Sequence, residues 1–362
     1  MTTERGRDQG RDEAAPRLPV ITASAMTVTV RRVVREAADA VSLVLRAEDG
    51  HRLAPAPGQF LTVRVPGGRA RCYSFSHTAP EPAITVKRVP GGIGSNWLCD
   101  TATTGTRLTV LPPAGAFTPS SPDADLLLVA AGGGITPLLP MARSALEEGK
   151  GRVVLLYANR EPGTVLFRDE LRRLAAAHPA RLLVHHLLSS VQGRPRREQL
   201  AQLVAPYAER EVFLCGPAGF MAAATDALRS QGVPRGRLHR EVFVSLSGDV
   251  FSETPAPPSE GGTAPAAPRD GADLTVDIDE RSHSLTWPAA TTLLDTLLAA
   301  GIDAPFSCRE GSCGACACRV VRGEVDHGTG GALTPEDRAE GYVLACRARP
   351  RGGRPAVHVS YD

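Results

Sequence analysis

The sequence has almost no net charge, no long apolar run and no internal repeat. Lysine and arginine number 41 and aspartate and glutamate 39, a formal charge of +2, so nucleic acid is not expected as a main partner. The longest apolar run covers only residues 126–131, far too short to span a bilayer. Residues 1–24 are polar, lack the apolar core of a signal peptide and are expected to form a disordered arm.

Residues for acid and base catalysis are also lacking. No pair of titratable side chains stands out, and His77 and His283 show no ligand spacing. Chemistry that needs a general base is therefore not indicated. The eight cysteines do not suggest a disulfide framework, because four belong to one motif and Cys72, Cys99 and Cys215 are scattered. A reducing cytoplasm is the expected location.

Four cysteines form the most informative motif. The order Cys308-x4-Cys313-x2-Cys316, with Cys346 after a further 29 residues, is the plant-type spacing of a 2Fe-2S cluster. Cys313-x2-Cys316 alone would favour a structural zinc site, but the distant fourth cysteine reverses that preference. The four thiolates are therefore predicted to hold a cluster that transfers single electrons. Cys318 is expected in a strand, with ligand exchange as the alternative.

Composition divides the chain. Residues 247–272 are dense in proline, alanine, glycine and serine and are predicted to form a flexible linker. Residues 272–362 hold 13 acidic and 9 basic side chains, a balance of −4, which leaves +6 for the rest. These opposite charges favour docking between the two parts, although an ordinary solvated surface explains them equally well.

Two different patterns of apolar and polar residues precede the linker. Residues 25–120 alternate short β-branched runs, such as MTVTVRRVV and FLTVRV, with proline-glycine turns, which is typical of an antiparallel β-barrel. Residues 121–246 change to buried-type strands such as DLLLVAA, which alternate with helical stretches. This alternation predicts an α/β doubly wound domain with a parallel sheet.

The first strand of this second domain runs into a glycine turn. Gly132, Gly133 and Gly134 are followed by Thr136 and Pro137 and then by a helix. Such a turn lets the backbone approach a pyrophosphate, and the helix N-terminus supplies amides. A plain tight turn requires the same glycines, so the value of this signal depends on the neighbouring motifs.

Those motifs resemble the ferredoxin-NADP reductase superfamily over residues 25–245. Arg71-Cys72-Tyr73-Ser74 is similar to the flavin motif of that family. The resemblance implies that Arg71 meets the flavin pyrophosphate, that Tyr73 stacks on the isoalloxazine ring and that Ser74 faces its N5 atom.

The same resemblance assigns further positions. The segment around Gly94 favours FAD over FMN, and Arg160 is compatible with the 2′-phosphate of NADPH. No second arginine or serine completes a phosphate pocket, so NADH is favoured. The implied catalytic positions are Tyr73, Ser74, Thr136, Cys215 and Glu241. The implied cofactor-binding positions are Arg71, Tyr73, Ser74, Val86, Lys87, Arg88, Gly94, Ser95, Asn96, Gly132, Gly133, Gly134, Thr136, Pro137, Arg160, Cys215, Gly216, Pro217 and Phe243.

Residues 293–350 resemble a plant-type ferredoxin, which implies an α+β (β-grasp) domain over residues 273–362. Leu293, Leu294, Leu297 and Leu298, with Gly301 beyond them, predict a short helix ahead of the cluster loop. The complete order is a β-barrel FAD domain at residues 25–120, an NAD domain at 121–246, a linker and a ferredoxin.

This order resembles the reductase components of bacterial oxygenase systems, especially the 3-ketosteroid 9-alpha-hydroxylase branch and the phenylacetyl-CoA epoxidase reductases. The resemblance implies that NADH delivers a hydride to FAD and that the cluster passes electrons singly to a terminal oxygenase of the Rieske type. A fatty acid desaturase or a cytochrome P450 is an alternative acceptor. An alternative of another class is a redox-sensing or zinc-binding interaction protein. A monomer without a membrane span is expected.

Overall fold

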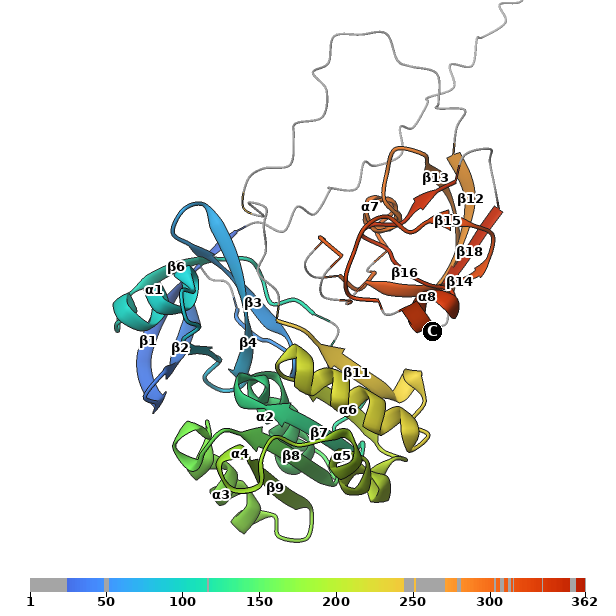
Figure 1. Cartoon of the computed structure of the whole chain (residues 1–362). Helices are drawn as coiled ribbons and strands as arrows, with labels where there is room; N and C mark the ends of the chain where they lie inside the picture. Colours follow the sequence, from blue (N-terminus) through green and yellow to red (C-terminus); the bar gives the residue numbers. More distant parts are fainter. Residues whose placement is uncertain are drawn as a thin grey trace, which may run out of the picture.

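The computed structural model describes residues 25–48, 52–115, 117–243, 251, 271–278, 281–302, 304–306, 309–311, 314, 316–333, 335–351 and 356–361. They form a closed barrel, a five-stranded sheet flanked by helices, and a smaller mixed sheet (Figure 1). The multidomain fold class predicted from the sequence is confirmed. The predicted arm at residues 1–24 and most of the predicted linker lie outside the described residues. Within the described ranges, no helix is long and apolar enough to cross a membrane.

The barrel closes in the strand order β1-β2-β5-β4-β3-β6. The first five residues of β1, Met26–Val30, alternate between buried and half-buried, as the β-branched pattern predicts. Leu43, Phe75 and Ile84 are fully buried in its core, and the helix α1 adds Leu98. The elements are β1 (Met26–Ala37), β2 (Ala40–Ala47), β3 (Phe60–Val65), β4 (Arg69–His77), β5 (Ala83–Lys87), α1 (Ile93–Thr101) and β6 (Arg107–Val110).

The second unit is a parallel sheet in the order β11-β10-β7-β8-β9 with helices on both faces. Every residue of β7 is buried, because Leu126 and Leu128 pack with α2 and α3 while Leu127 and Val129 pack with α5 and α6. The strands are β7 (Leu126–Ala131), β8 (Val153–Asn159), β9 (Leu182–Leu188), β10 (Glu211–Cys215) and β11 (Leu238–Glu241). The helices are α2 (Ile135–Arg143), α3 (Arg168–Ala177), α4 (Ser189–Gln192), α5 (Arg197–Val204) and α6 (Ala218–Ser230).

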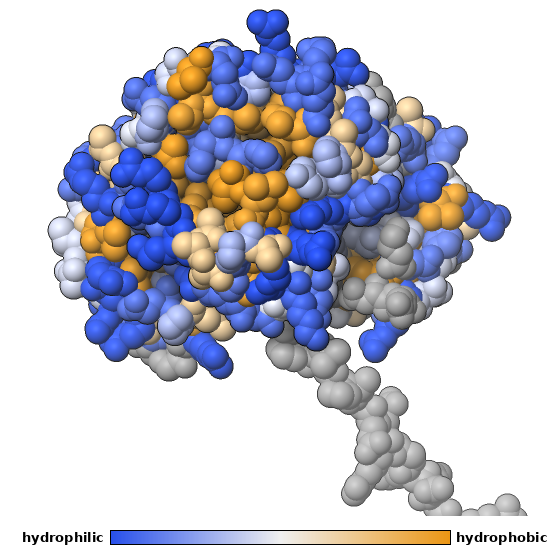
Figure 2. Space-filling model, turned by 90° about the horizontal axis from the view of Figure 1, so that it is seen from below, coloured by the Kyte–Doolittle hydropathy of each residue, from blue (hydrophilic) through white to orange (hydrophobic). Residues whose placement is uncertain are grey.

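The face of the molecule on the side of this unit is largely hydrophilic. Viewed from below, it exposes apolar side chains mainly in its middle, surrounded by hydrophilic ones (Figure 2). The edge strand β9 leaves Leu183 44% exposed, and α4 leaves Val191 77% exposed. Leu183 is exposed because β9 is an edge strand, with no further strand paired to its outer side among the described residues. Val191 is exposed on α4, which directly follows this edge strand.

The third unit is a mixed sheet in the order β13-β12-β18-β14-β16. The predicted short helix is present as α7, which the Thr292 side chain caps by accepting a hydrogen bond from the Asp295 N–H at 3.1 Å. β12 begins at Gly271, slightly before the predicted boundary at residue 273. The elements are β12 (Gly271–Ile278), β13 (Arg281–Pro288), α7 (Leu293–Ala299), β14 (Ala317–Arg322), β15 (Val325–Asp326), α8 (Pro335–Ala339), β16 (Tyr342–Leu344), β17 (Arg349–Pro350) and β18 (Ala356–Ser360).

The glycine turn of the second unit packs directly against β10. A Cβ atom at Gly134 would lie 2.1 Å from the Cys215 carbonyl oxygen, so only glycine fits. Gly132 has a φ of +53°, which also favours glycine. The Tyr157 hydroxyl donates to the Gly132 carbonyl at 3.1 Å and accepts from the Leu166 N–H at 3.2 Å. The turn is therefore fixed from both sides.

Replacing Gly134 by alanine is expected to destabilise the α/β unit by about 1–3 kcal/mol, because the added methyl group overlaps the backbone of β10. Gly163→Ala is the matched control, since a Cβ atom there meets nothing within 4 Å. Thermal unfolding of both variants tests the prediction, and equal melting temperatures would contradict it.

Candidate functional site

The predicted flavin motif lies on β4, and α1 packs against it. A Cβ atom at Gly94 would lie 2.9 Å from Cγ of Arg71 and 3.0 Å from the Tyr73 hydroxyl oxygen. The structure thus brings Gly94 of α1 against Arg71 and Tyr73 of β4, more than 20 positions earlier in the sequence. Ser74 is buried next to them on the same strand. Burial raises the pKa of Tyr73 above its ordinary value, although the charge of Arg71 opposes the shift. The phenol therefore stays neutral.

The side chains of Ser95 and Asn96 hold the loop before α1. The Ser95 hydroxyl accepts a hydrogen bond from the Val89 N–H at 3.1 Å, and the Asn96 amide donates to the Val89 carbonyl at 3.3 Å. Because these side chains are engaged within the loop, an anion at this end of α1 would meet backbone amides of the first turn. The geometry fits a diphosphate held mainly by backbone groups.

The segment Val86, Lys87 and Arg88 ends β5, and its three side chains differ in place. Val86 is fully buried in the barrel core. Lys87 pairs with Asp39 at 3.5 Å, and its Cδ atom lies 3.9 Å from the Cβ position of Gly133. Arg88 is bound to α1 through Asp100 at 2.6 Å. Lys87 thus lies beside the glycine turn, whereas Val86 can offer a ligand only its backbone.

The glycine turn and the end of β10 form the other wall of the candidate site. A Cβ atom at Gly134 would also lie 2.8 Å from the Gly216 nitrogen, so the two loops are in contact. The Thr136 hydroxyl donates to the Gly133 carbonyl at 3.0 Å, which fixes its side chain over the turn. Pro137 is buried at the start of α2, and Pro217 precedes α6.

Cys215 is fully buried at the end of β10. It lies in register with Glu241 of β11, which brings this predicted pair onto neighbouring strands. Burial raises the pKa of the Cys215 thiol well above its ordinary value, and the charge of Glu241 adds to the shift. A neutral thiol is a poor nucleophile, so the residue can contact a ring without reacting with it.

Three further residues lie at the border of this region. Phe243 is 51% exposed beyond β11, so it does not belong to a core. Arg160 is exposed directly after β8. Asn159, which the sequence analysis did not single out, is only 6% exposed, and neither its amide nitrogen nor its amide oxygen has a hydrogen-bond partner of normal geometry among the described residues. The Asn159 amide lies beside the Tyr157 hydroxyl at the carboxyl end of β8.

Two of the four predicted cluster ligands can be described. Cys316 and Cys346 are 2% and 5% exposed, and the Ala345 N–H donates to the Cys316 carbonyl at 3.0 Å, which ties the two ligand segments together. Cys308 and Cys313 lie outside the described residues. Gly311 and Gly314 have φ of +77° and +80°, which shapes a tight loop around this place. Buried thiols in a glycine-rich loop fit an iron-sulfur cluster.

Cys318 lies in the sheet instead. It is 1% exposed on β14, in register with Val343. Burial raises the pKa of this thiol to about 12. The strand position expected for Cys318 is confirmed.

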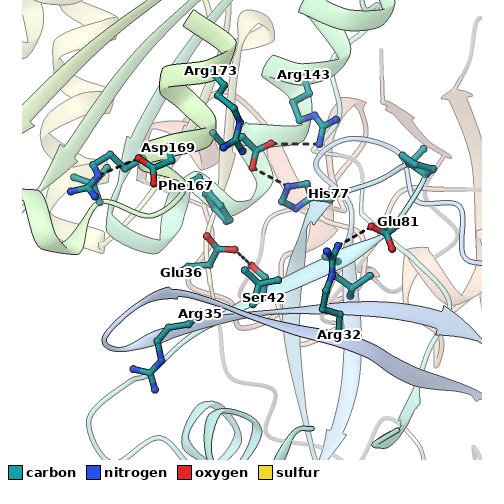
Figure 3. A pocket seen from close by; sticks show the side chains of 18 of the residues that line it. Arg32, Arg35, Glu36, Ser42, His77, Glu81, Arg143, Phe167, Asp169 and Arg173 are labelled. Carbon is teal, nitrogen blue, oxygen red and sulfur yellow. Dashed lines mark hydrogen bonds and ion pairs between the residues drawn. The ribbon is translucent and has the colours of Figure 1, made fainter. Parts of the chain in front are cut away.

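A cavity of about 560 Å³ lies between the barrel and the α/β unit (Figure 3). Its lining is strongly polar, with Arg32, Arg35, Arg143 and Arg173 among the cations. None of the predicted site residues lines it. This cavity therefore does not coincide with the candidate site.

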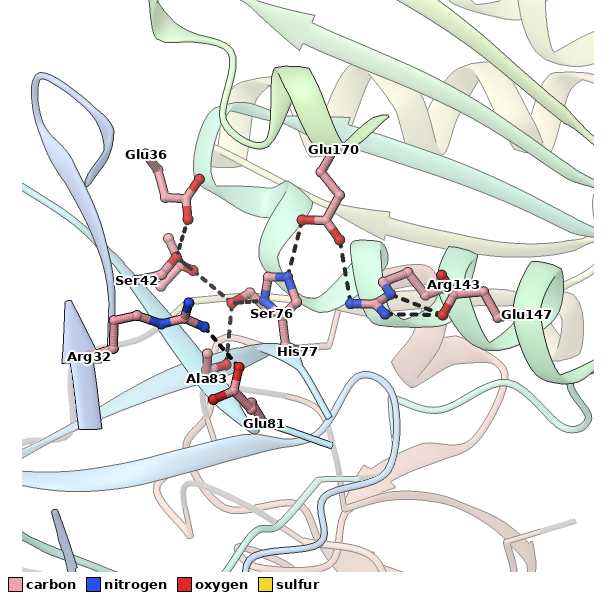
Figure 4. A network of polar contacts seen from close by, with 11 residues as sticks. Arg32, Glu36, Ser42, Ser76, His77, Glu81, Ala83, Arg143, Glu147 and Glu170 are labelled. Carbon is pink, nitrogen blue, oxygen red and sulfur yellow. Dashed lines mark hydrogen bonds and ion pairs between the residues drawn. The ribbon is translucent and has the colours of Figure 1, made fainter. Parts of the chain in front are cut away.

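Polar side chains form a chain through the barrel beside this cavity (Figure 4). Ser42 donates to the Glu36 carboxylate at 2.7 Å and lies 2.6 Å from the Thr85 hydroxyl. Thr85 donates to Ser76 at 2.7 Å, and Ser76 also donates to the Ala83 carbonyl at 3.2 Å. The buried hydroxyls therefore satisfy one another.

The chain crosses into the α/β unit through His77. Ser76 lies 3.2 Å from Nδ1 of His77, and Nε2 of His77 lies 3.1 Å from Glu170 of α3. Arg143 of α2 pairs with the other Glu170 oxygen at 3.5 Å. The sequence analysis left His77 as an ordinary surface or core residue, and no local pattern marks a partner 93 positions away. These contacts fix the position of the barrel against the α/β unit.

The two carboxylates of this network have opposite pKa shifts. Burial raises the pKa of Glu36, although the hydrogen bond from Ser42 opposes the shift. Burial also acts to raise the pKa of Glu170, but the hydrogen bond and charge of His77 and the charge of Arg143 outweigh it, so this pKa is lowered. Ionised Glu170 therefore stabilises the interface, whereas ionised Glu36 weakens the barrel.

Comparison with known proteins gives matches in both halves of the chain. Residues 128–226 match the oxidoreductase NAD-binding domain, and residues 276–351 match the 2Fe-2S iron-sulfur cluster binding domain. The ferredoxin reductase component of 3-ketosteroid-9-alpha-monooxygenase from Rhodococcus rhodochrous is 50% identical over 332 residues, which cover 89% of this chain and 93% of that protein.

Two more distant matches have the same extent. A component of the 1,2-phenylacetyl-CoA epoxidase from Escherichia coli is 32% identical over 350 residues, which cover 90% of this chain and 94% of that protein. The structure of phthalate dioxygenase reductase, described as a modular structure for electron transfer from pyridine nucleotides to 2Fe-2S, has a TM-score of 0.55 at 26% identity. That match covers 93% of this chain and 97% of the other.

Gly94→Ala is expected to lower the FAD content of the purified protein several-fold, because the new Cβ atom enters the space between Arg71 and Tyr73. Ile93→Ala is the control, since Ile93 is the neighbouring residue of α1 and is 46% exposed. Flavin absorbance per mole of protein measures the effect. Full flavin content in Gly94→Ala would show that this contact does not border the flavin.

Glu170→Gln is expected to lower the melting temperature at pH 7 by about 1–3 °C. Because the pKa of Glu170 lies below its ordinary value of 4.5, its stabilisation is complete above pH 4.5 and is lost as the pH falls through the folded-state pKa. The difference from the unmodified protein should therefore shrink toward pH 4. Glu36→Gln should act in the opposite direction at pH 7, because a raised pKa favours the neutral form. Shifts of equal sign in the two variants would contradict the assignment.

Proposed function

The chain belongs to the family of oxygenase reductase components that combine an NAD-binding oxidoreductase domain with a 2Fe-2S domain, and we propose that its electrons go to a Rieske-type oxygenase that hydroxylates a 3-ketosteroid. As a member of this family, it is an FAD- and 2Fe-2S-dependent NADH oxidoreductase that supplies a terminal oxygenase. The steroid is favoured by one observation, the 50% identity to the Rhodococcus component over nearly the full length of both chains.

Bound FAD accepts two electrons from NADH as a hydride, and the bound cluster passes electrons on one at a time. For this exchange the protein needs to bind and orient two flat rings. We assign Arg71 to the flavin diphosphate and Tyr73 to the face of its ring, which is supported by their contact with the start of α1. The hydroxyl of Ser74, on the same strand, would orient the ring without adding charge.

The nicotinamide side of the site is assigned to the loops after β7 and β10. The glycine turn offers backbone amides to the NADH diphosphate, and its close packing on Cys215 and Gly216 keeps both loops in place. Thr136 and Cys215 would border the nicotinamide ring, and the protonated thiol of Cys215 adds neither charge nor a competing nucleophile. Hydride transfer needs no general base, which agrees with the absence of one from the assigned residues.

The finer properties of the protein are proposed in the same way. Arg160 is followed by the acidic Glu161 and not by a second cation, which supports NADH rather than NADPH as the donor. The protein is proposed to be a monomer. It is proposed to act in the reducing cytoplasm, because its four cluster thiolates must stay free of disulfides. A desaturase or a cytochrome P450 accepts electrons of the same kind, so the acceptor itself has to be tested.

The electron path is tested by Cys346→Ser, with Cys318→Ser as the matched control. Both cysteines are buried in the same unit, but only Cys346 is assigned to the cluster. Cys346→Ser is expected to lower NADH-driven reduction of cytochrome c at least about ten-fold while NADH still bleaches the flavin. Cys318→Ser should keep both activities. A colourless protein, or full activity of Cys346→Ser, would reject the proposed wiring.

The acceptor is tested by reconstitution. The reductase and NADH should support hydroxylation of a 3-ketosteroid by a Rieske-type terminal oxygenase, with product formation followed by chromatography. NADPH in place of NADH, and a fatty acid desaturase or a cytochrome P450 in place of the oxygenase, are the comparison arms. Faster turnover in either acceptor arm would replace the steroid oxygenase as partner.

A further inference from the structure

One carboxylate of the ferredoxin unit is buried against the α/β unit by three arginines. Asp337 of α8 is 0% exposed. Its Oδ1 atom accepts from Arg229 of α6 at 3.4 Å and from Arg235, and its Oδ2 atom accepts from Arg240 of β11 at 3.3 Å. The three arginines come from separate elements, so the pocket for this carboxylate is formed only by the folded α/β unit.

A second contact between the α/β unit and the ferredoxin unit lies beside the same carboxylate. The Arg235 guanidinium lies over the ring of Tyr342, 3.8 Å from its centroid. Tyr342 begins β16, shortly after α8. Arg235 therefore binds one anion and one aromatic face of the ferredoxin unit at once.

The arginines depend on this partner. Burial and the charges of Arg235 and Arg229 all lower the pKa of Arg240, because three like charges are held close together. Asp337 offsets this repulsion in a place that is largely removed from water. Without its charge, the arginines would repel one another and regain hydration if the ferredoxin unit moved away.

The contact also lies beside both redox regions. Arg240 precedes Glu241, which is in register with Cys215 at the candidate nicotinamide site. On the other side, β16 begins at Tyr342 and ends two residues before the predicted cluster ligand Cys346. It pairs with β14, which begins directly after the predicted ligand Cys316. Elements that carry the candidate nicotinamide site and elements that carry the cluster ligands thus meet at this point.

We propose that Arg229, Arg235 and Arg240 form the docking surface on which the ferredoxin unit receives its electrons, with Asp337 as the anchor. The inference rests on the electron path proposed above. The two electrons of one NADH, which leaves as NAD⁺ and one proton, would pass singly through the one cluster, and the acceptor would reoxidise the cluster after each electron. The docked position would hold the cluster-bearing unit against the α/β unit during each single-electron step. At this contact, an acidic side chain of the part with a net charge of −4 meets basic side chains of the part with a net charge of +6.

The test compares Asp337→Asn with Asp273→Asn in the full-length holoprotein. The control removes a charge from the same unit at an exposed position on β12. Rapid mixing with NADH is followed at flavin and cluster wavelengths. Asp337→Asn is expected to slow cluster reduction by about ten-fold or more and to leave flavin reduction unchanged. The reason is that removing one charge of a buried ion pair leaves the other charges buried without a partner, which destabilises the contact. Asp273→Asn should change neither rate.

A second variant approaches the same contact from the α/β unit. Arg229→Gln should also slow cluster reduction and leave flavin reduction unchanged. Asp337→Glu, which keeps the negative charge, should reduce the cluster faster than Asp337→Asn does. Small-angle X-ray scattering should show a larger radius of gyration for Asp337→Asn than for the unmodified protein. Cluster absorbance confirms that the ferredoxin unit of each variant is folded.

The outcomes separate the two proposals. If NADH fails to reduce the cluster of the unmodified protein, the electron path itself is wrong. If the unmodified cluster is reduced and Asp337→Asn and Arg229→Gln match its rate and its radius of gyration, the docking surface is wrong while the electron path stands.

Discussion

Charge pairs between separately folded units are the interaction on which this molecule depends. The barrel meets the α/β unit through His77 and Glu170, and the ferredoxin unit meets the α/β unit through Asp337. Each pair is shielded from water, where a charge without a partner is costly. The α/β unit therefore serves as the common support, to which the barrel is attached by polar contacts together with apolar packing, such as that of Ala40 and Phe167, and the ferredoxin unit through Asp337.

Glycine packing works alongside these charges at shorter range. Gly94 and Gly134 each stand where a side chain would overlap a neighbouring segment, and each brings a loop within contact of another strand. Flat cofactors need such places, because the backbone itself has to approach them. The cavity lined by Arg32 and Arg143 is not part of the assigned site and lies elsewhere between the barrel and the α/β unit.

The sequence predicted the elements whose signals are local. The glycine turn at Gly132, the Leu293 helix and the loop with Cys308, Cys313 and Cys316 each lie within a short stretch, and the fixed cysteine spacing added Cys346 from 29 residues further on. The folds of the barrel and the α/β unit followed from the change in hydrophobic pattern along the chain, and the β-grasp fold followed from the resemblance to plant-type ferredoxins. The placement of each assigned side chain toward a cofactor remains a prediction, because it depends on groups that the protein binds.

Contacts between distant segments could not be predicted in this way. His77 and Glu170 are 93 positions apart, and Arg235 and Asp337 are 102 positions apart. Each residue looks like an ordinary surface charge in its own segment. The difference in net charge between the two parts of the chain indicated an attraction, but it named neither the arginines nor their partner, because a sum of charges contains no positions.

The protonated state of Cys215 has a consequence for the lifetime of the protein. An enzyme that handles low-potential electrons in air loses some of them to oxygen and thereby makes hydrogen peroxide. Peroxide attacks thiolates far faster than thiols. A fully buried cysteine whose pKa is raised well above its ordinary value presents almost no thiolate at neutral pH. The sulfur atom proposed to border the nicotinamide is thus protected from an oxidant that would form close to it.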